Sequence, residues 1–219
     1  MKLADMTVTQ FVDTVASDAP APGGGSVAAL AGSIGAALAG SIGAALTAMV
    51  GNLTQGRKKY AAFAEYAAEV EQKGNDLKAR LIDVMDRDTE AFNVVSDAFG
   101  MPKDTDEQKA ARSAAIQNGL KGCTKTPMEM MEIIDESVTL AASLLEHGFN
   151  DTSASDLGVA FLSLKAGIQG AWLNVLINIG SIKDQDFAAE YRKKGEALLA
   201  HALPLCDKSF EKLTAMIEG

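Results

Sequence analysis

The sequence has only two cysteines and two histidines: Cys123, Cys206, His147 and His201. A structural zinc site needs four nitrogen or sulfur ligands at close local spacing, and these four residues are scattered along the chain. We therefore predict no metal site. One disulfide is an alternative, but we favour two free thiols in a reducing cytosol.

Positive charge is also scarce, because 20 Lys and Arg residues stand against 29 Asp and Glu residues, for a net charge of -9. Such a chain repels phosphate backbones, so we expect no nucleic-acid partner. Residues 1–13 carry Lys2, Asp5 and Asp13 and lack an uninterrupted apolar segment, which excludes a typical secretory signal. We expect a cytoplasmic protein.

Strand-like alternation of apolar and polar residues is missing as well. Gly and Pro separate long segments rich in Ala, Leu, Glu and Lys, and capping boxes at Thr7 with Gln10 and at Thr105 with Gln108 fit helix starts. We predict an all-α fold, a helical bundle that forms a single domain over residues 1–219. The expected helices span residues 7–18, 25–54, 58–99 (with Gly74 and Asn75 as an alternative break), 105–121, 127–147, 155–179 and 184–217, with a kink at Pro204.

Residues 19–56 contain no charged side chain and are long enough to span a membrane. Ala, Gly and Ser dominate this segment, so its transfer into lipid is weakly favourable, and we predict a long central helix of a soluble bundle with no membrane partner. The sequence AGSIGAAL at 31–38 is repeated at 39–46 and places small residues on one helical row: Ala28, Gly32, Ala36, Gly40 and Ala44. Such rows permit close backbone packing, and their extent predicts a homodimer.

A glycine run, Gly23, Gly24 and Gly25, leads with Ser26 into this central helix. Free N–H groups and the positive dipole at a helix start can bind an anion or a carbonyl group. A simple turn is the alternative, because the segment fits neither a P-loop nor a G-x-G-x-x-G pattern.

The helix expected over residues 58–99 carries a carboxylate on its apolar face. Helical spacing places Asp88 among apolar residues such as Val84 and Phe92, where a carboxylate must be paired, hydrogen-bonded or protonated. A catalytic base and a core aspartate bound by a neighbouring helix are both open. Asp86 lies on a different face of the same helix.

Two amides, Asn174 and Asn178, lie one helical turn apart in an apolar segment. Together they could read a heterocycle edge that both donates and accepts, or they could join helices. Asp156 could act chemically or only as a helix N-cap. Arg57, in a basic triplet at 57–59, suits a substrate with carboxylates, or is part of a solvated helix start.

Taken together, these motifs resemble the cyclodeaminase/cyclohydrolase family. The similarity covers almost the whole chain, and its most specific parts are APGGGSVAA at 21–29, DxDxEAF at 86–92, SDLxVA at 155–160 and GAxxNVLIN at 170–178. The family comprises methenyltetrahydrofolate cyclohydrolases and the cyclodeaminase domain of formiminotransferase-cyclodeaminase. The resemblance implies an all-α homodimer that binds folate between its helices.

The resemblance also implies one of two reactions in one-carbon metabolism. A cyclohydrolase adds water to 5,10-methenyltetrahydrofolate and gives 10-formyltetrahydrofolate, whereas a cyclodeaminase closes the ring of 5-formimidoyltetrahydrofolate and expels ammonia, as a lyase does. The sequence has no fused formiminotransferase segment, so we expect the cyclohydrolase. A non-catalytic folate-binding or helical interaction module is an alternative of another class.

The resemblance assigns expected roles to the candidate residues. Asp88 is the expected catalytic base, and Asp86 and Asp156 are weaker catalytic candidates. The two amides would read the pterin, the turn from Gly23 to Ser26 would hold the substrate, and Arg57 would meet glutamyl carboxylates. We expect no cofactor besides the folate substrate.

Overall fold

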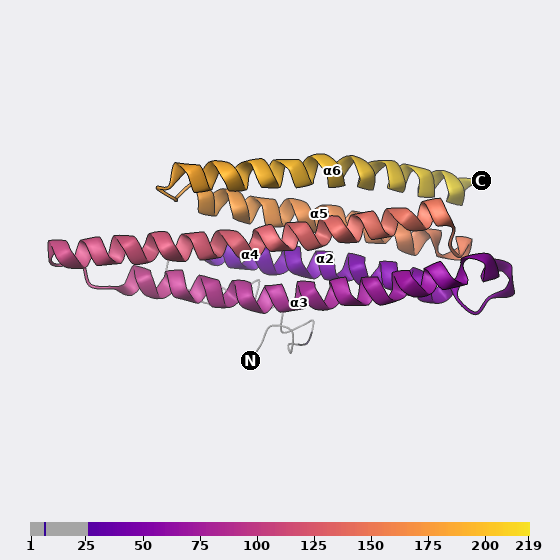
Figure 1. Cartoon of the computed structure of the whole chain (residues 1–219), viewed down its shortest axis with the longest axis horizontal. Helices are drawn as coiled ribbons and strands as arrows, with labels where there is room; N and C mark the ends of the chain where they lie inside the picture. The colour runs from indigo at the N-terminus through magenta and orange to yellow at the C-terminus, as the bar shows by residue number, and fades with distance from the viewer. Residues whose placement is uncertain (1–6, 8–25) are drawn as a thin grey trace.

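The computed structural model describes Thr7 and residues 26–219, with the backbone alone for residues 26–34. This part of the chain contains five long α-helices and no strand (Figure 1). The helices are α2 (Ser26–Thr54), α3 (Ala64–Gly100), α4 (Asp106–His147), α5 (Ala154–Ile179) and α6 (Gln185–Glu218), with short 3₁₀ helices η2 (Lys58–Phe63) and η3 (Asp151–Ser153). The predicted all-α bundle is confirmed, and the helix expected over residues 7–18 lies outside the described residues.

The helices lie side by side along the long axis of the molecule, with α6 packed on α5 and α2 behind α3 and α4 (Figure 1). The Gly/Ala-rich α2 contacts α3, α4 and α5. Its small residues Ala36, Gly40 and Ala44 are buried, as the helical row predicted. This helix is therefore the central one of the bundle.

The predicted end of a helix at 121 and new start at 127 were wrong. Helix α4 runs without a break through Gly122 and Pro127. A helix-interior Gly costs about 1 kcal/mol and a Pro about 3 kcal/mol relative to Ala. Burial of Met128, Met130 and Met131 along the same face offsets that cost, because tertiary packing overrides local propensity.

One further boundary differs from the sequence-based expectation, while the continuity expected through Gly74 is confirmed. Helix α3 continues through Gly74, which packs against Ala48 of α2. A side chain at residue 74 would collide with Ala48, so glycine is required there. Residues 58–63 form η2 instead of the start of α3, with a non-helical conformation at Tyr60 (φ -112°, ψ 16°). Helix α6 is continuous through Pro204.

The expected capping box of α4 and the glycines expected to follow α4 and α5 are confirmed, whereas the N-cap position of α5 is occupied by Ser153 and not by Asp156. The Thr105 hydroxyl accepts from the backbone N–H of Gln108 at 3.2 Å, and Gln108 Oε1 accepts from the Thr105 N–H at 3.1 Å. Gly148 ends α4 with a φ of +100°, which favours glycine, and Gly180 follows the last residue of α5. These features mark both ends of α4 and the C-terminal end of α5.

In the described part of the chain, two helical segments are long and apolar enough to cross a membrane by length and composition: Gly35–Thr54 and Asp151–Ile179. The second adds to the one apolar segment identified from the sequence. Inside the bundle, 56% of the first window and 44% of the second are buried. Both helices thus contribute to the protein core.

Both cysteines are free thiols buried in the core, as favoured from the sequence. Burial raises the pKa of Cys206 to about 12. Among the residues described, no group of three or more His, Cys, Asp and Glu side chains is placed to hold a metal ion.

Candidate functional site

Two bidentate ion pairs join α3 to α4 and show how the two helices are aligned. Arg80 binds Glu136 at 2.6 and 2.9 Å, and one heptad later Arg87 binds Glu129 at 2.8 and 2.7 Å. Arg87 holds the pKa of Glu129 below its ordinary value. Because α3 and α4 are antiparallel, the residue that follows Arg87 lies beside the α4 residues that precede Glu129.

That next residue is Asp88, the main catalytic candidate. It is 7% exposed and accepts a short hydrogen bond from the Thr126 hydroxyl of α4. Burial, and then the nearby Asp88 carboxylate, raise the pKa of the Cys123 thiol to about 12. The predicted buried position of Asp88 is confirmed, together with a donor on a neighbouring helix.

The two predicted amides lie on α5 and use their nitrogens in different ways. Asn178 Nδ2 donates to the Cys123 carbonyl of α4 at 2.6 Å, which is the helix-joining contact considered above. Asn174 is 6% exposed, and its Nδ2 donates within α5 to the Gly170 carbonyl at 2.9 Å. Since both nitrogens bond to carbonyls, each amide keeps its oxygen as an acceptor.

Helix packing brings these residues toward the first half of α2. A Cβ on Gly43 would lie 2.5 Å from Leu164, and one on Gly170 would lie 3.1 Å from Ala36. Residue numbers therefore rise along α5 as they fall along the facing α2, so the two helices are antiparallel. In the same antiparallel sense, Gly74 of α3 packs on Ala48, whereas Gly40 meets Leu81. Asp88 lies seven residues beyond Leu81 and Asn174 four residues beyond Gly170, both in the direction of the Ser26 end of α2.

The other candidates are distributed unevenly. Asp86 is half-buried on α3, two residues from Asp88. Asp156 is half-buried in the first turn of α5, about 27 Å along the helix from Asn174 at 1.5 Å per residue. Arg57 is exposed just before η2, at the same end as Asp156. Within one chain, the fold therefore does not bring Asp156 or Arg57 to Asp88.

The glycine turn is the remaining candidate. Gly23, Gly24 and Gly25 lie outside the described residues. Ser26 is the first residue of α2. The free N–H groups of that helix start thus face the end of the bundle toward which the Asp88 and Asn174 helices run.

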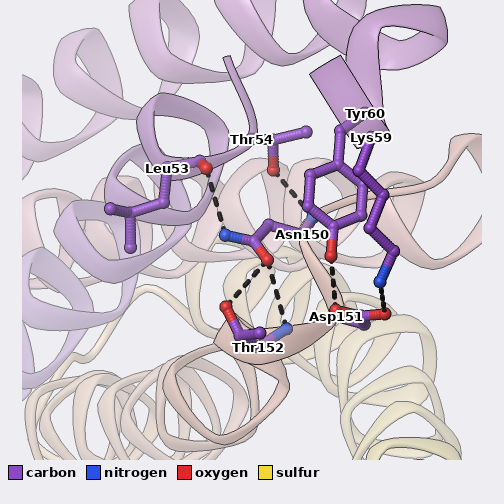
Figure 2. Close-up of polar contacts among 7 residues, drawn as sticks. All are labelled: Leu53, Thr54, Lys59, Tyr60, Asn150, Asp151 and Thr152. Atoms are coloured by element: carbon purple, nitrogen blue, oxygen red, sulfur yellow. Dashed lines mark hydrogen bonds and ion pairs between the residues drawn. The ribbon is translucent and has the colours of Figure 1, made fainter. Parts of the chain in front are cut away.

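A second polar cluster joins the turns at the opposite end of the bundle (Figure 2). Lys59 Nζ lies 2.6 Å from Asp151 Oδ2, and the Tyr60 hydroxyl donates to the other oxygen of Asp151. Asn150 bonds to the Thr54 hydroxyl through its backbone N–H at 2.9 Å. Lys59 and then Tyr60 hold the pKa of Asp151 below its ordinary value.

This cluster contains no group placed near Asp88, and we predict a purely structural role. Tyr60→Phe removes the hydroxyl donor of a side chain that is 6% exposed, so the free energy of unfolding should fall by about 1 kcal/mol. Urea unfolding measures the change. Tyr191→Phe, whose ring keeps its stacking on Phe187, is the matched control. An equal loss in both variants would contradict the assignment.

Sequence reasoning missed Thr126, Cys123 and Pro127 as neighbours of the site. The Thr-Pro pair at 126 and 127 was interpreted as a helix start, although it lies inside α4. The basic triplet near Tyr60 was noticed, but no sequence pattern linked it to Asp151, 91 residues away. Only the alignment of the helices reveals these partners.

Comparison with known proteins finds a family over most of this chain. The family model described as Formiminotransferase-cyclodeaminase matches residues 7–197. A methenyltetrahydrofolate cyclohydrolase from Methylorubrum extorquens is 41% identical over 96% of this chain and 97% of its own length. A formimidoyltransferase-cyclodeaminase from Rattus norvegicus is 33% identical over 91% of this chain, which spans only 35% of that longer protein.

A solved structure has the same fold. The crystal structure of formiminotetrahydrofolate cyclodeaminase from Thermotoga maritima superimposes with a TM-score of 0.79 at 25% identity. The match covers 100% of this chain and 98% of that one. The bundle described above is thus shared along its whole length.

Proposed function

Because this chain belongs to the formiminotransferase-cyclodeaminase family, we propose that it is a methenyltetrahydrofolate cyclohydrolase. The observation that carries the proposal is the relative of that name, which is 41% identical and matches this chain from end to end. The buried carboxylate of Asp88 supplies the chemistry that such an enzyme needs.

The substrate carries a positive amidinium carbon between N5 and N10. A buried carboxylate stabilises a cation in its vicinity and can take a proton from water. Water adds to this carbon while Asp88 accepts one of its protons. The bond from carbon to N5 then breaks, N5 takes up a proton, and the formyl group stays on N10, with one proton released overall.

The amides of α5 are proposed to bind the pterin ring. Asn174 and Asn178 each present an oxygen after donating to a carbonyl, and a reduced pterin carries several N–H donors. Because histidine is scarce, proton transfer would fall to carboxylates, Lys or Tyr, and Asp88 is our first choice. Arg57 and Asp156, at the far end, are proposed to contact only parts of the substrate distant from the reacting carbon.

Cyclodeaminase activity is the second candidate. The Thermotoga maritima protein of that name aligns over 98% of its chain, so a chain of this size is compatible with either reaction. Both reactions act on the bridge between N5 and N10, and the same buried carboxylate would serve both. Which of the two reactions the protein catalyses therefore depends on which folate it binds as substrate.

One experiment tests the proposal. Purified protein is mixed separately with 5,10-methenyltetrahydrofolate and with 5-formimidoyltetrahydrofolate, and the absorbance of the methenyl group is followed. We expect a loss of absorbance in the first mixture above the uncatalysed rate. A gain only in the second would establish the cyclodeaminase, and no change in either would favour a binding module.

Asn174 offers a prediction about substrate affinity. Asn174→Ala removes an acceptor that faces a desolvated heterocycle, which costs about 1 to 3 kcal/mol, while Asp88 remains in place. Substrate affinity should fall about tenfold or more, with a smaller change in turnover. Equilibrium binding and steady-state kinetics measure both, and unchanged affinity with a lower melting temperature would make Asn174 a structural residue.

A homodimer is proposed as the assembly. Apolar side chains on the outer faces of α2 and α5 repeat at spacings of three, four or seven residues, the pattern of helices that pack against other helices. On α2 they are Leu38, Ile42, Ala45 and Met49, and on α5 Val159, Leu162, Ala166 and Leu173. Ile42 is 45% exposed and Leu173 66% exposed, so a second copy would cover them.

Sedimentation tests the dimer. The protein should sediment at about twice 22.9 kDa, and Ile42→Glu should shift it toward the monomer. Val94→Glu, at an exposed position of α3, is the matched control. A 22.9 kDa species at micromolar concentration would overturn the proposal.

We also propose a cytoplasmic location, in keeping with two reduced thiols, which fractionation of cells would test.

A further inference from the structure

Pro127 lies inside α4, far from either end of the helix. Proline has no backbone N–H, so the carbonyl four residues earlier loses its helical donor. In α4 that carbonyl belongs to Cys123, and it accepts a hydrogen bond from Asn178 Nδ2 of α5 at 2.6 Å. The amide of one helix thus replaces the donor that proline removes from another.

This contact fixes the orientation of the Asn178 amide. A carbonyl oxygen can only accept, so Nδ2 must face α4, and the amide cannot exchange the places of its nitrogen and oxygen. Cys123 lies three residues before Thr126, the donor to Asp88. Asn178 and Asp88 therefore meet α4 within one turn, from α5 and from α3.

We propose that Pro127 is a positioning residue: the carbonyl that it leaves open orients Asn178, so that Oδ1 accepts from an N–H group of the bound heterocycle beside Asp88. The inference rests on the proposed function for the identity of the heterocycle. It goes beyond that function because it assigns a role in substrate selection to a helix-interior proline. A ring that carries an acceptor where the substrate carries N–H would be disfavoured.

A double-mutant cycle in thermal unfolding tests the contact without substrate. Asn178→Ala leaves the Cys123 carbonyl without its donor and should lower the melting temperature by about 4 °C. Pro127→Ala returns a backbone N–H to that carbonyl. In the Pro127→Ala background, the effect of Asn178→Ala should be at most half as large. Equal effects in both backgrounds would overturn the proposal.

Kinetics test the consequence for the substrate. In Pro127→Ala the new N–H competes with Asn178 for the carbonyl, so KM for methenyltetrahydrofolate should rise at least threefold while kcat stays within about twofold. Pro204→Ala is the matched control, because it removes the other proline inside a helix, on α6. Its KM should equal that of the parent.

The thermal cycle and the kinetics test different parts of the proposal: the contact between Asn178 and the Cys123 carbonyl, and its role in substrate selection. Coupling in the cycle without a change in KM would make the contact purely structural and overturn the role in selection. A parent protein that turns over neither folate would overturn the proposed function and, with it, that role. The cycle needs no substrate, so it still decides whether Pro127 orients Asn178.

Discussion

Asp88→Asn should lower turnover of methenyltetrahydrofolate by about a hundredfold or more. The variant keeps the size of the side chain and an oxygen that can accept from Thr126. It loses the negative charge that opposes the amidinium and the basic oxygen that takes the proton from water, a loss in the range measured for positioned general bases. Steady-state kinetics, with circular dichroism to verify folding, measure the effect.

Two other aspartates on α3 make this result specific. Asp83→Asn, at an exposed residue that bonds to Arg87, is the matched control and should retain turnover within a few-fold. Asp86→Asn tests the weaker candidate, which lies on a different face of the same helix. The melting temperature of Asp88→Asn should equal or exceed that of the parent, since the variant no longer buries a charge. Parent-like turnover in Asp88→Asn would make this residue part of the core.

The helical bundle and the burial of Asp88 were predictable because both follow from local periodicity. Apolar spacing along residues 58–99 places Asp88 on the inner face, and the structure has it 7% exposed. The capping box at Thr105 and the glycine ends at 148 and 180 were likewise local signals. Each of these features depends on residues within about one turn of one another.

The partners of the site were not predictable, because they depend on how helices align. Asp88 meets Thr126 across 38 residues of sequence, in the same helix alignment that pairs Arg80 with Glu136 and Arg87 with Glu129. The helix start expected at Pro127 was wrong because α4 continues through this residue, and Asn178, 55 residues beyond Cys123, supplies a donor to the carbonyl that proline frees. A tertiary contact therefore overruled a local signal at the very residues that adjoin the site.

Gly167→Ala should destabilise the protein by about 2 kcal/mol, because α5 touches the small-residue row of α2 at this position. An added Cβ would lie 2.9 Å from the Gly40 nitrogen and 3.0 Å from the Ala36 carbonyl oxygen. Both are backbone atoms, so relief requires α2 and α5 to move apart. That cost exceeds the gain of about 1 kcal/mol in helix propensity, and thermal unfolding should show a melting temperature lower by about 4 to 8 °C.

Gly122→Ala is the matched control, at another glycine inside a helix. Of the atoms that the structure describes, none outside its own helix turn lies within 4 Å of the position of its added Cβ, so only the gain in helix propensity remains. The melting temperature should rise by about 2 to 4 °C. Opposite signs for the two substitutions follow from packing alone, because the local propensity change is the same. A stabilised Gly167→Ala would mean that α2 and α5 are not in backbone contact, and that the approach of Asn174 to the start of α2 must be abandoned with it.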